Sequence, residues 1–500
     1  MRGIPSLITD IRKKVFSEVA RMAYSGDYTQ MEDIPFRIVP GQNPLHRESI
    51  FLERAIAGER VRLAMGLSLQ PVQQRTLLSE GMDQAAIAEQ YYEPPLVNII
   101  PYACHACPTH RYYATELCQG CLAASCQQVC PKGAIKFVNG RCRIMESQCI
   151  KCGKCAAACP YHAIVHLQRP CQEACGMDAI GADEYGKAQI DYDRCVACGQ
   201  CLVSCPFGAI VDKSQIYQVI RAILEEKSVV AIVAPSFVGQ FGKDVTVPKF
   251  VAAMKQLGFS GVVEVAAGAD ICAIEEARDF LEKVPAEQKF LATSCCPSWR
   301  MMARRLFPQE SGNISMTYTP MIYTARLVKR EQPEAKVVFV GPCAAKKLEA
   351  MQAELRSDVD FVLTYEELMG IFEAKEIDFA AIEPEADLQD GSGAGRGFAS
   401  AGGVAAAVEE IIRREHPEAE IRTQRADGLR ECRKLLMQAK AGRLDGYLLE
   451  GMACPGGCIA GAGTVIPAET AKKKLAAHVA QAKETSSADG PYRELVGKLD

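Results

Sequence analysis

Cysteine spacing is the strongest chemical feature of this sequence of 500 residues. The chain has 24 cysteines, and 17 of them lie between Cys104 and Cys205. Two segments, 149–160 and 195–206, carry the pattern C-x2-C-x2-C-x3-C-P. On such a loop three thiolates can occupy three corners of a 4Fe-4S cubane, while the fourth points toward a neighbouring cluster. The spacing therefore predicts at least two 4Fe-4S clusters.

The same half-motif occurs four times within residues 96–212, ending in CPKGAI, CPYHAI, CGMDAI and CPFGAI. The first copy has two extra residues in its middle loop. The third copy keeps only its last two cysteines, and Cys104 with Cys107 can supply the missing pair. Pairing adjacent copies predicts four cubanes, because half-motifs exchange their fourth cysteines. The predicted ligand sets are Cys118, Cys121, Cys126 with Cys159; Cys149, Cys152, Cys155 with Cys130; Cys195, Cys198, Cys201 with Cys175; and Cys104, Cys107, Cys171 with Cys205.

A rival pairing of these ligands stays open. It joins the two complete motifs directly, so that Cys159 and Cys205 exchange clusters, and it treats Cys171 and Cys175 as an inserted site. The spacing alone does not choose between the two pairings.

Zinc is the competing metal for the incomplete motifs, because zinc commonly uses C-x2-C pairs in a tetrahedral set. His105 and His110 lie near the first such pair, and we do not expect them to be ligands. Cys142, in the segment GRCRIM, is predicted to be a buried free thiol on a strand.

Composition narrows the remaining classes of function. The chain is 48% apolar and 24% charged with a net charge of −4, which is typical of soluble globular proteins. We expect no nucleic-acid partner from this charge balance. We expect no membrane association, because no run of about 18 apolar residues occurs and the N-terminus lacks an apolar signal stretch. So many cysteines then favour metal binding in a reducing, cytoplasmic compartment.

The chain divides into three predicted domains. Residues 1–95 lack cysteine and have the apolar spacing of helices, which predicts a helical N-terminal extension. Residues 96–212 form the predicted cluster-binding domain. Residues 213–500 alternate strand-like runs such as VVAIVAP and KVVFVGP with helical stretches, and they end in a helical tail. The glycine-rich segment 391–404 lacks a phosphate-binding pattern, and we expect a flexible surface loop there.

Three further motifs carry a family resemblance: TSCCPSW at 293–299, PCAAKKLE at 342–349 and EGMACPGGC at 450–458. In this order they resemble the signature motifs of FeFe-hydrogenases, and the single tryptophan, Trp299, stands at a position the family expects. The resemblance covers about 213–465, with 96–212 as its cluster-bearing arm. It implies an α/β catalytic domain of two lobes around a buried metal cluster, preceded by an α+β ferredoxin-like multi-cluster domain and the helical extension.

The resemblance implies an H-cluster, a 4Fe-4S cubane linked to a diiron subcluster with carbon monoxide, cyanide and azadithiolate ligands. Its cubane ligands would be Cys296, Cys343, Cys454 and Cys458, and the Cys458 thiolate would bridge to the diiron unit. Six residues stand at positions expected to contact or support the diiron unit: Ala234, Pro235, Ser236, Met452, Lys346 and Glu349.

The family also implies a route for protons. Cys295 would be the general acid/base beside the diiron unit, and Glu276, Ser315 and Asp279 would lead from it to solvent. The alternative for Glu276 and Asp279 is a solvated helix face, because acids three residues apart are common there.

Two departures from the family pattern qualify the match. Gly341 stands where many members have methionine, which we expect to open space beside the distal iron, and Asp279 stands where glutamate is usual. With the unusual cluster arm, these departures resemble the group B monomeric branch.

The implied activity is the reversible conversion of two protons and two electrons into dihydrogen. The implied partners are a ferredoxin or flavodoxin and the hydrogenase maturation proteins. A hydrogen sensor and an iron–sulfur scaffold protein remain as alternatives, although the presence of Cys295 and Lys346 and the lack of an obvious output domain favour the enzyme.

Overall fold

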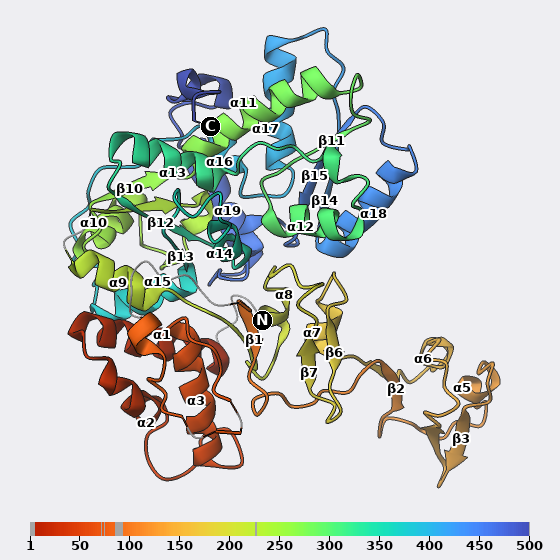
Figure 1. Cartoon of the computed structure of the whole chain (residues 1–500). Coiled ribbons are helices and arrows are strands. Elements are labelled where there is room, and N and C mark those ends of the chain that lie inside the picture. Colours follow the sequence, from red (N-terminus) through yellow and green to blue (C-terminus); the bar gives the residue numbers. More distant parts are fainter. Residues whose placement is uncertain (1–5, 72, 75, 86–93, 226–227, 500) are drawn as a thin grey trace.

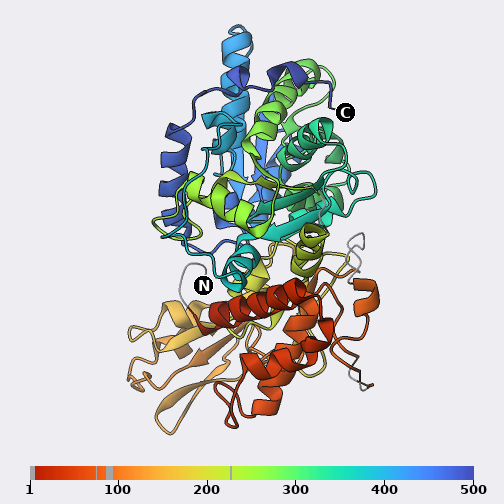
Figure 2. The same cartoon turned by 90° about the vertical axis from the view of Figure 1, so that its left-hand side faces the viewer.

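The computed structural model describes residues 6–71, 73–74, 76–85, 94–225 and 228–499. Parts of the predicted extension, namely 1–5, 72, 75 and 86–93, therefore lie outside the described residues. A large α/β body carries the C-terminal half of the chain, while the N-terminal helices and the cluster arm lie along one side of it (Figures 1 and 2). None of the described helices is long and apolar enough to span a bilayer.

Two parallel sheets form the body. The first has the order β10-β9-β12-β13 and the second β11-β15-β14. Strand β9 is buried at every position, as expected for a parallel strand that is covered on both faces. The strands are β9 (Val229–Val233), β10 (Gly261–Glu264), β11 (Leu291–Ala292), β12 (Lys336–Gly341), β13 (Phe361–Thr364), β14 (Arg422–Asp427) and β15 (Tyr447–Met452).

Helices connect these strands and cover the sheets. Helix α11 is the longest of the body, and it packs against α13 and α17. The helices are α9 (Ile216–Leu224), α10 (Val247–Leu257), α11 (Ala266–Lys283), α12 (Pro297–Leu306), α13 (Pro320–Glu331), α14 (Ala345–Ala350), α15 (Tyr365–Ala374), α16 (Gly393–Gly397), α17 (Gly403–Glu415), α18 (Leu429–Lys440) and α19 (Ala468–Ala480).

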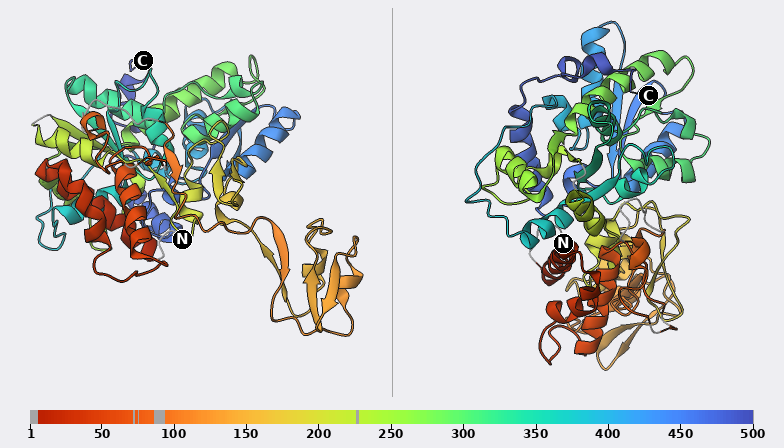
Figure 3. Two further views of the ribbon diagram at one scale, coloured as in Figure 1. Left: turned by 60° about the horizontal axis from the view of Figure 1, so that its bottom comes forward. Right: turned by 60° about the vertical axis from the view of Figure 1, so that its left-hand side comes forward.

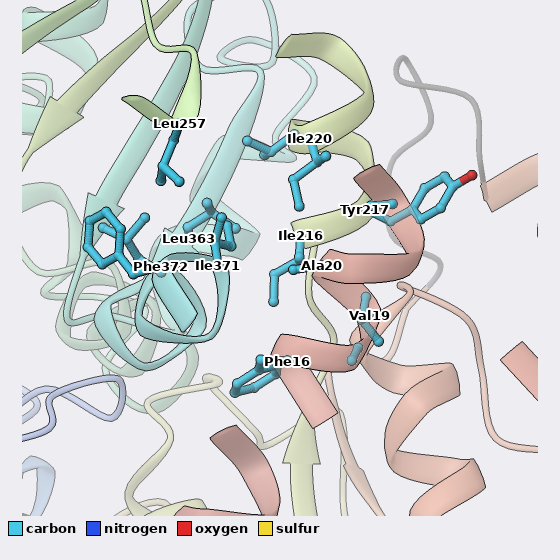
Figure 4. Close-up of a cluster of buried hydrophobic side chains, with 14 of the residues drawn as sticks. Phe16, Val19, Ala20, Ile216, Tyr217, Ile220, Leu257, Leu363, Ile371 and Phe372 are labelled. Atoms are coloured by element: carbon cyan, nitrogen blue, oxygen red, sulfur yellow. The ribbon is translucent and has the colours of Figure 1, made fainter. Parts of the chain in front are cut away.

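The N-terminal helices share a core with the body. Helix α1 begins after Ser6, whose hydroxyl accepts a hydrogen bond from the Thr9 amide, and it ends at Gly26 in the left-handed conformation. Its apolar face, including Phe16, packs on α9 and α15 (Figure 4). The contact is close, because a Cβ added to Gly370 of α15 would lie 2.4 Å from the Phe16 Cβ. The helices of this region are α1 (Leu7–Ser25), α2 (Ile34–Ile38), α3 (Ile50–Ala64) and α4 (Met82–Ala85).

A buried charge network joins the N-terminal helices, the arm and the body. The Lys347 ammonium of α14 lies 2.7 Å from carboxylate oxygens of both Asp212 and Glu367. Arg12 of α1 lies 2.7 Å from Glu366. Since Lys347 directly follows Lys346 in the PCAAKKLE motif, this network also fixes the helix that carries Lys346.

The arm consists of two small modules of antiparallel strand pairs. The inner module, residues 97–109 and 169–212, lies against the body, and the outer module, residues 110–168, projects away from it (Figures 1 and 3). The inner module has β1 (Val97–Ile99), β6 (Ile180–Ala182), β7 (Ala188–Ile190), β8 (Ile210–Asp212), α7 (Pro170–Glu173) and α8 (Gln200–Ser204). The outer module has β2 (Arg111–Ala114), β3 (Ile135–Val138), β4 (Arg141–Ile144), β5 (Ile164–Leu167), α5 (Ser125–Gln128) and α6 (Lys154–Ala157).

The prediction of a flexible surface loop at 391–404 is wrong. The segment contains α16 and the beginning of α17, and both Ser392 and Arg396 are fully buried. The Arg396 guanidinium pairs with the Glu264 carboxylate at 2.9 Å, and the Ser392 hydroxyl donates to Asp270. Glycine at 395 is required by close packing, because a Cβ there would lie 2.5 Å from the Ala266 carbonyl oxygen. Small residues therefore serve tight packing here.

Candidate active site

The four cysteines predicted to hold the H-cluster meet at one cavity of the body. Cys296 follows β11, Cys343 follows β12, and Cys454 and Cys458 follow β15, so the ligands emerge where parallel strands end. All four line the cavity.

The backbone positions the cysteines tightly. Cys296 is the N-cap residue of α12, and its sulfur accepts a hydrogen bond from the Ala453 amide at 3.4 Å. Gly457, directly before Cys458, has φ +93°, and a Cβ there would lie 2.5 Å from the Ala401 nitrogen. Only glycine fits this turn, which brings the Cys458 thiol to the same cavity as the other three.

These residues fit a large iron–sulfur cofactor. The cavity brings together four sulfur donors, and one of them already accepts an amide hydrogen bond of the kind that tunes clusters. A cationic group is also present at the wall, because the buried Lys346 lines the same cavity. Cys296, Cys343, Cys454 and Cys458 could hold a cubane, and the same lining includes Cys295 and Met452, which are predicted to face a diiron unit.

Lys346 is held by the carboxylate of Glu349, three residues further along α14. The ammonium nitrogen and the carboxylate oxygen are 2.6 Å apart. Burial acts to lower the pKa of Lys346, but Glu349 and the nearby thiols outweigh it and raise this pKa. The side chain therefore stays cationic at the cavity wall and can donate to an anionic ligand.

Of the other residues predicted to contact the diiron unit, some line the cavity and one does not. Ala234, Pro235 and Met452 line the cavity. Ser236 is buried but does not belong to the lining, and its hydroxyl is 2.8 Å from the Tyr365 hydroxyl. Tyr365 in turn donates to the Ala234 carbonyl at 3.0 Å, so it fixes this wall of the cavity, a role that the sequence analysis did not assign to it.

The expectation that Gly341 opens space in the cavity is wrong. The ring of Phe339, two residues earlier on the same strand, fills the volume, because a Cβ added to Gly341 would lie 2.4 Å from two of its ring atoms. Phe339 itself lines the cavity. The loss of a large side chain at one position is thus offset by an aromatic ring from the same face of β12.

Cys295 and Glu276 are the two residues predicted to act as acid and base beside the cavity. Cys295 lines the cavity, and burial, followed by the nearby Glu276 carboxylate, raises the pKa of its thiol far above the usual range. Glu276 lies on α11 with no exposed surface, and burial raises its pKa to about 8. One oxygen accepts hydrogen bonds from the Ser294 amide at 2.7 Å and hydroxyl at 3.1 Å. Glu276 does not belong to a solvated helix face.

The two outer residues of the predicted proton route, Ser315 and Asp279, are in contact. The Ser315 hydroxyl lies 3.0 Å from the Asp279 carboxylate, and Asp279 is partly exposed beside Lys283. Within the described hydrogen bonds Ser315 and Glu276 are not joined directly. Thr317 lies between them, because its hydroxyl is 2.8 Å from Ser315 and its carbonyl accepts from the Ser294 hydroxyl at 2.7 Å.

Two residues that hydrogen-bond with members of the predicted route, Ser294 and Thr317, were not predicted. Ser294 directly precedes Cys295 in the TSCC motif, and this position could have identified it as a neighbour of the site. Thr317 is two residues from Ser315, but nothing in its type or spacing distinguished it.

The inner module of the arm places one predicted cluster beside the cavity. Cys198 lines the cavity together with Cys296, and it packs in one cluster of side chains with Cys175 and Cys195. Thiols of this set also surround Cys201. The Ser298 hydroxyl of α12 donates to the Val196 carbonyl at 2.9 Å, which ties the arm to the body at this point.

The structure brings the other predicted ligands together in separate groups. A second small cavity is lined by all of Cys104, Cys107, Cys171 and Cys205. His105 stacks on the Phe207 ring with the ring centroids 4.4 Å apart.

In the outer module, Cys126 is surrounded by the thiols of Cys121 and Cys159, while Cys149 and Cys152 neighbour Cys155. Cys118 and Cys130 pack in the same cluster of side chains. Cys142 is buried on β4, as predicted.

Comparisons with known proteins identify the family of the body and of the arm. The family model "Iron only hydrogenase large subunit, C-terminal domain" matches residues 227–462, and two "4Fe-4S dicluster domain" models match 110–160 and 148–209. "Iron hydrogenase 1" of Clostridium pasteurianum is 31% identical over 67% of this chain and 67% of its own length. "NADP-reducing hydrogenase subunit HndD" of Solidesulfovibrio fructosivorans is 30% identical over 51% of this chain and 53% of its own length.

Among solved structures, the FeFe-hydrogenase HydA1 from Chlamydomonas reinhardtii aligns with 57% of this chain and 94% of its own. The TM-score is 0.47 at 20% identity.

Proposed function

Because this chain belongs to the iron-only hydrogenase family, we propose that it makes or splits dihydrogen at an H-cluster held by Cys296, Cys343, Cys454 and Cys458. The observation that carries the proposal is the single cavity that unites these thiols with Cys295, beside the buried Glu276. The reaction joins two protons and two electrons in one dihydrogen molecule, or the reverse.

When bound, the H-cluster supplies the iron site and the basic amine at which dihydrogen is formed or cleaved. The chain's own residues hold the cubane, place the Lys346 charge at the wall and exclude bulk water through apolar side chains such as Phe339 and Met452.

Protons move along side chains of this chain. The high pKa of Cys295 keeps the thiol protonated at neutral pH, so it can give a proton to the cavity and regain one. Glu276, with a pKa of about 8, exchanges protons close to neutral pH. Ser294 lies at the inner end of the route beside Glu276, and Thr317 and Ser315 lead to Asp279 near the surface. Because the Thr317 carbonyl that accepts from Ser294 cannot pass a proton on, the proposal requires a water molecule between the Ser294 and Thr317 hydroxyls.

Electrons follow the arm in this proposal. The sets Cys195, Cys198, Cys201, Cys175 and Cys104, Cys107, Cys171, Cys205 would hold cubanes in the inner module, and the two remaining sets would hold cubanes in the outer one. The Cys198 contact with the cavity supports the inner module as the last step before the H-cluster. A ferredoxin is the proposed electron partner, and the departures in the catalytic motifs support membership of the group B branch.

The experiment is hydrogen evolution by protein matured with hydrogenase assembly proteins, with chemically reduced methyl viologen as donor. We expect turnover in the wild type and a loss of at least about 10²-fold in Cys295→Ala at unchanged infrared bands and iron content. Cys432→Ala is the matched control, because Cys432 is buried but lies outside the cavity lining. A complete infrared spectrum without turnover in either direction would favour a sensor or a scaffold protein.

A further inference from the structure

We propose that the outward face of the β3–β4 hairpin, at the far end of the arm, is the docking surface for a small acidic ferredoxin. This inference rests on the proposed function and deepens it, because it assigns the place where electrons enter. The hairpin lies in the part of the outer module that is most distant from the body (Figures 1 and 3).

The register of the hairpin divides its side chains between two faces. Lys136 pairs with Arg143 and Val138 pairs with Arg141, and all four side chains are exposed. The alternate pairs, Ile135 with Ile144 and Phe137 with Cys142, face inward and are buried or half-buried. Because side chains alternate along a strand, three cations and one apolar residue share the outward face.

This outward face is basic and has few acidic partners. Lys136 and Arg143 are direct cross-strand neighbours, an arrangement of like charges that destabilises a hairpin. Among the described residues only Arg141 has an acidic partner there, Glu116. Residues 110–167 contain seven lysines and arginines against two acids, whereas the whole chain has a net charge of −4. A charged partner that binds this face would relieve the repulsion.

The inward face of the same hairpin contacts a predicted cluster. The Cys142 amide donates to the Cys118 sulfur at 3.3 Å, and the Cys142 sulfur lies 3.9 Å from the Cys126 sulfur. Only the thickness of one strand pair therefore separates the basic face from ligands of the outermost cubane. Cys118 begins the loop that also carries the fully exposed Leu122, and a Cβ on Gly120 of this loop would collide with Gly140 of the hairpin turn.

Charge complementarity identifies the partner's chemistry. An acidic surface is attracted to the three cations, while Val138 offers an exposed apolar contact on the same face. A ferredoxin donates one electron at a time, and a 4Fe-4S cubane of the arm also accepts one electron at a time. Two reduced ferredoxins are each oxidised by one electron per dihydrogen formed, and the two protons come from solvent.

The test uses the full-length matured enzyme with the charge reversal Lys136→Glu/Arg143→Glu. With reduced acidic 2[4Fe-4S] ferredoxin as donor at about 20 mM salt, we expect the KM for ferredoxin to rise at least about tenfold, and the difference to shrink at about 300 mM salt. With methyl viologen, which needs no docking surface, the rate should remain that of the wild type. The matched control is Lys472→Glu/Lys473→Glu on α19, which reverses two exposed charges of the body and should leave both assays unchanged.

Several outcomes would overturn the proposal. One is an unchanged KM for ferredoxin in the hairpin variant at low salt, and another is an equal effect of the α19 control. Exclusive use of flavodoxin, or hairpin-dependent binding of a DNA duplex without competition by ferredoxin, would assign the surface to another partner. Iron counting and redox titration by electron paramagnetic resonance show whether the charge-reversal variant keeps its arm clusters. If those clusters are lost, the uncharged Lys136→Gln/Arg143→Gln variant is used in its place. Absence of methyl viologen activity in the wild type would instead contradict the proposed function.

Discussion

Replacement of Glu276 by glutamine tests the acid/base part of the site most sharply. Glutamine keeps the shape of the side chain, and its carbonyl oxygen can still accept the 2.7 Å hydrogen bond from the Ser294 amide. Its amide group cannot exchange a proton at neutral pH. We therefore expect hydrogen evolution at pH 7 to fall by about 10²- to 10³-fold, the usual contribution of a general acid/base.

The same substitution should not weaken the fold at neutral pH. With a pKa of about 8, Glu276 is mostly protonated at pH 7 in the folded chain, so glutamine replaces a neutral group by a neutral one there. In the unfolded chain the carboxyl group ionises near its ordinary pKa of 4.5, which lowers the free energy of unfolding of the wild type by about 3 kcal/mol at pH 7. Glu276→Gln should therefore be at least as stable as the wild type at this pH. A loss of activity at pH 7 would then reflect chemistry and not unfolding.

The pH dependence of stability gives an independent check. Because burial raises the pKa of Glu276 from 4.5 to about 8, its contribution to stability is complete below pH 4.5 and is lost as the pH rises through 8. The loss amounts to at most about 5 kcal/mol. Urea titrations from pH 5 to 9 should show this decline in the wild type, and a smaller one in Glu276→Gln.

The assay for activity is hydrogen evolution from reduced methyl viologen, with iron content and infrared spectra recorded on the same samples. Glu282→Gln is the matched control, because Glu282 is an exposed acid on the same helix and should be replaceable without effect. The reasoning would be refuted if Glu276→Gln retained activity within twofold of the wild type, or if Glu282→Gln lost as much.

Two further substitutions test the frame around the site. Lys347→Met leaves the carboxylates of Asp212 and Glu367 buried without their cation. We therefore expect a loss of about 3–5 kcal/mol in the free energy of unfolding, measured by urea titration. An unchanged urea midpoint would contradict the role of the network. Gly341→Ala brings a Cβ to 2.4 Å from the Phe339 ring. We expect a loss of about 1–3 kcal/mol in the free energy of unfolding, together with altered infrared bands of the matured site. Wild-type stability and unchanged bands would show that the ring is not tightly held.

Much of the body could be predicted because its buried strands are continuous apolar runs. VVAIVAP and KVVFVGP contain β9 and β12, and the cysteines that follow KFLATS, KVVFVGP and GYLLEG do meet at one cavity. Strand β14, with the sequence RTQRAD, was missed because it has no such run, and its pairing with β15 is set by tertiary contacts.

The errors share a physical cause. Segment 391–404 consists mostly of small residues, which periodicity cannot classify, and its burial depends on Asp270 and Glu264 far away in the sequence. Likewise, the sequence around Gly341 does not reveal that the ring of Phe339 turns into the space beside it. Both outcomes depend on packing between elements, which local patterns do not contain.

Exchange between dihydrogen and heavy water tests the central claim most directly, because it requires the cavity and its proton route but no external electron donor. Matured wild-type protein under dihydrogen in deuterium oxide should release HD, and Cys295→Ala with the same infrared bands should release at least about 10²-fold less. A matured protein with complete infrared bands that releases no HD would contradict the assignment of this cavity as a hydrogen-converting site.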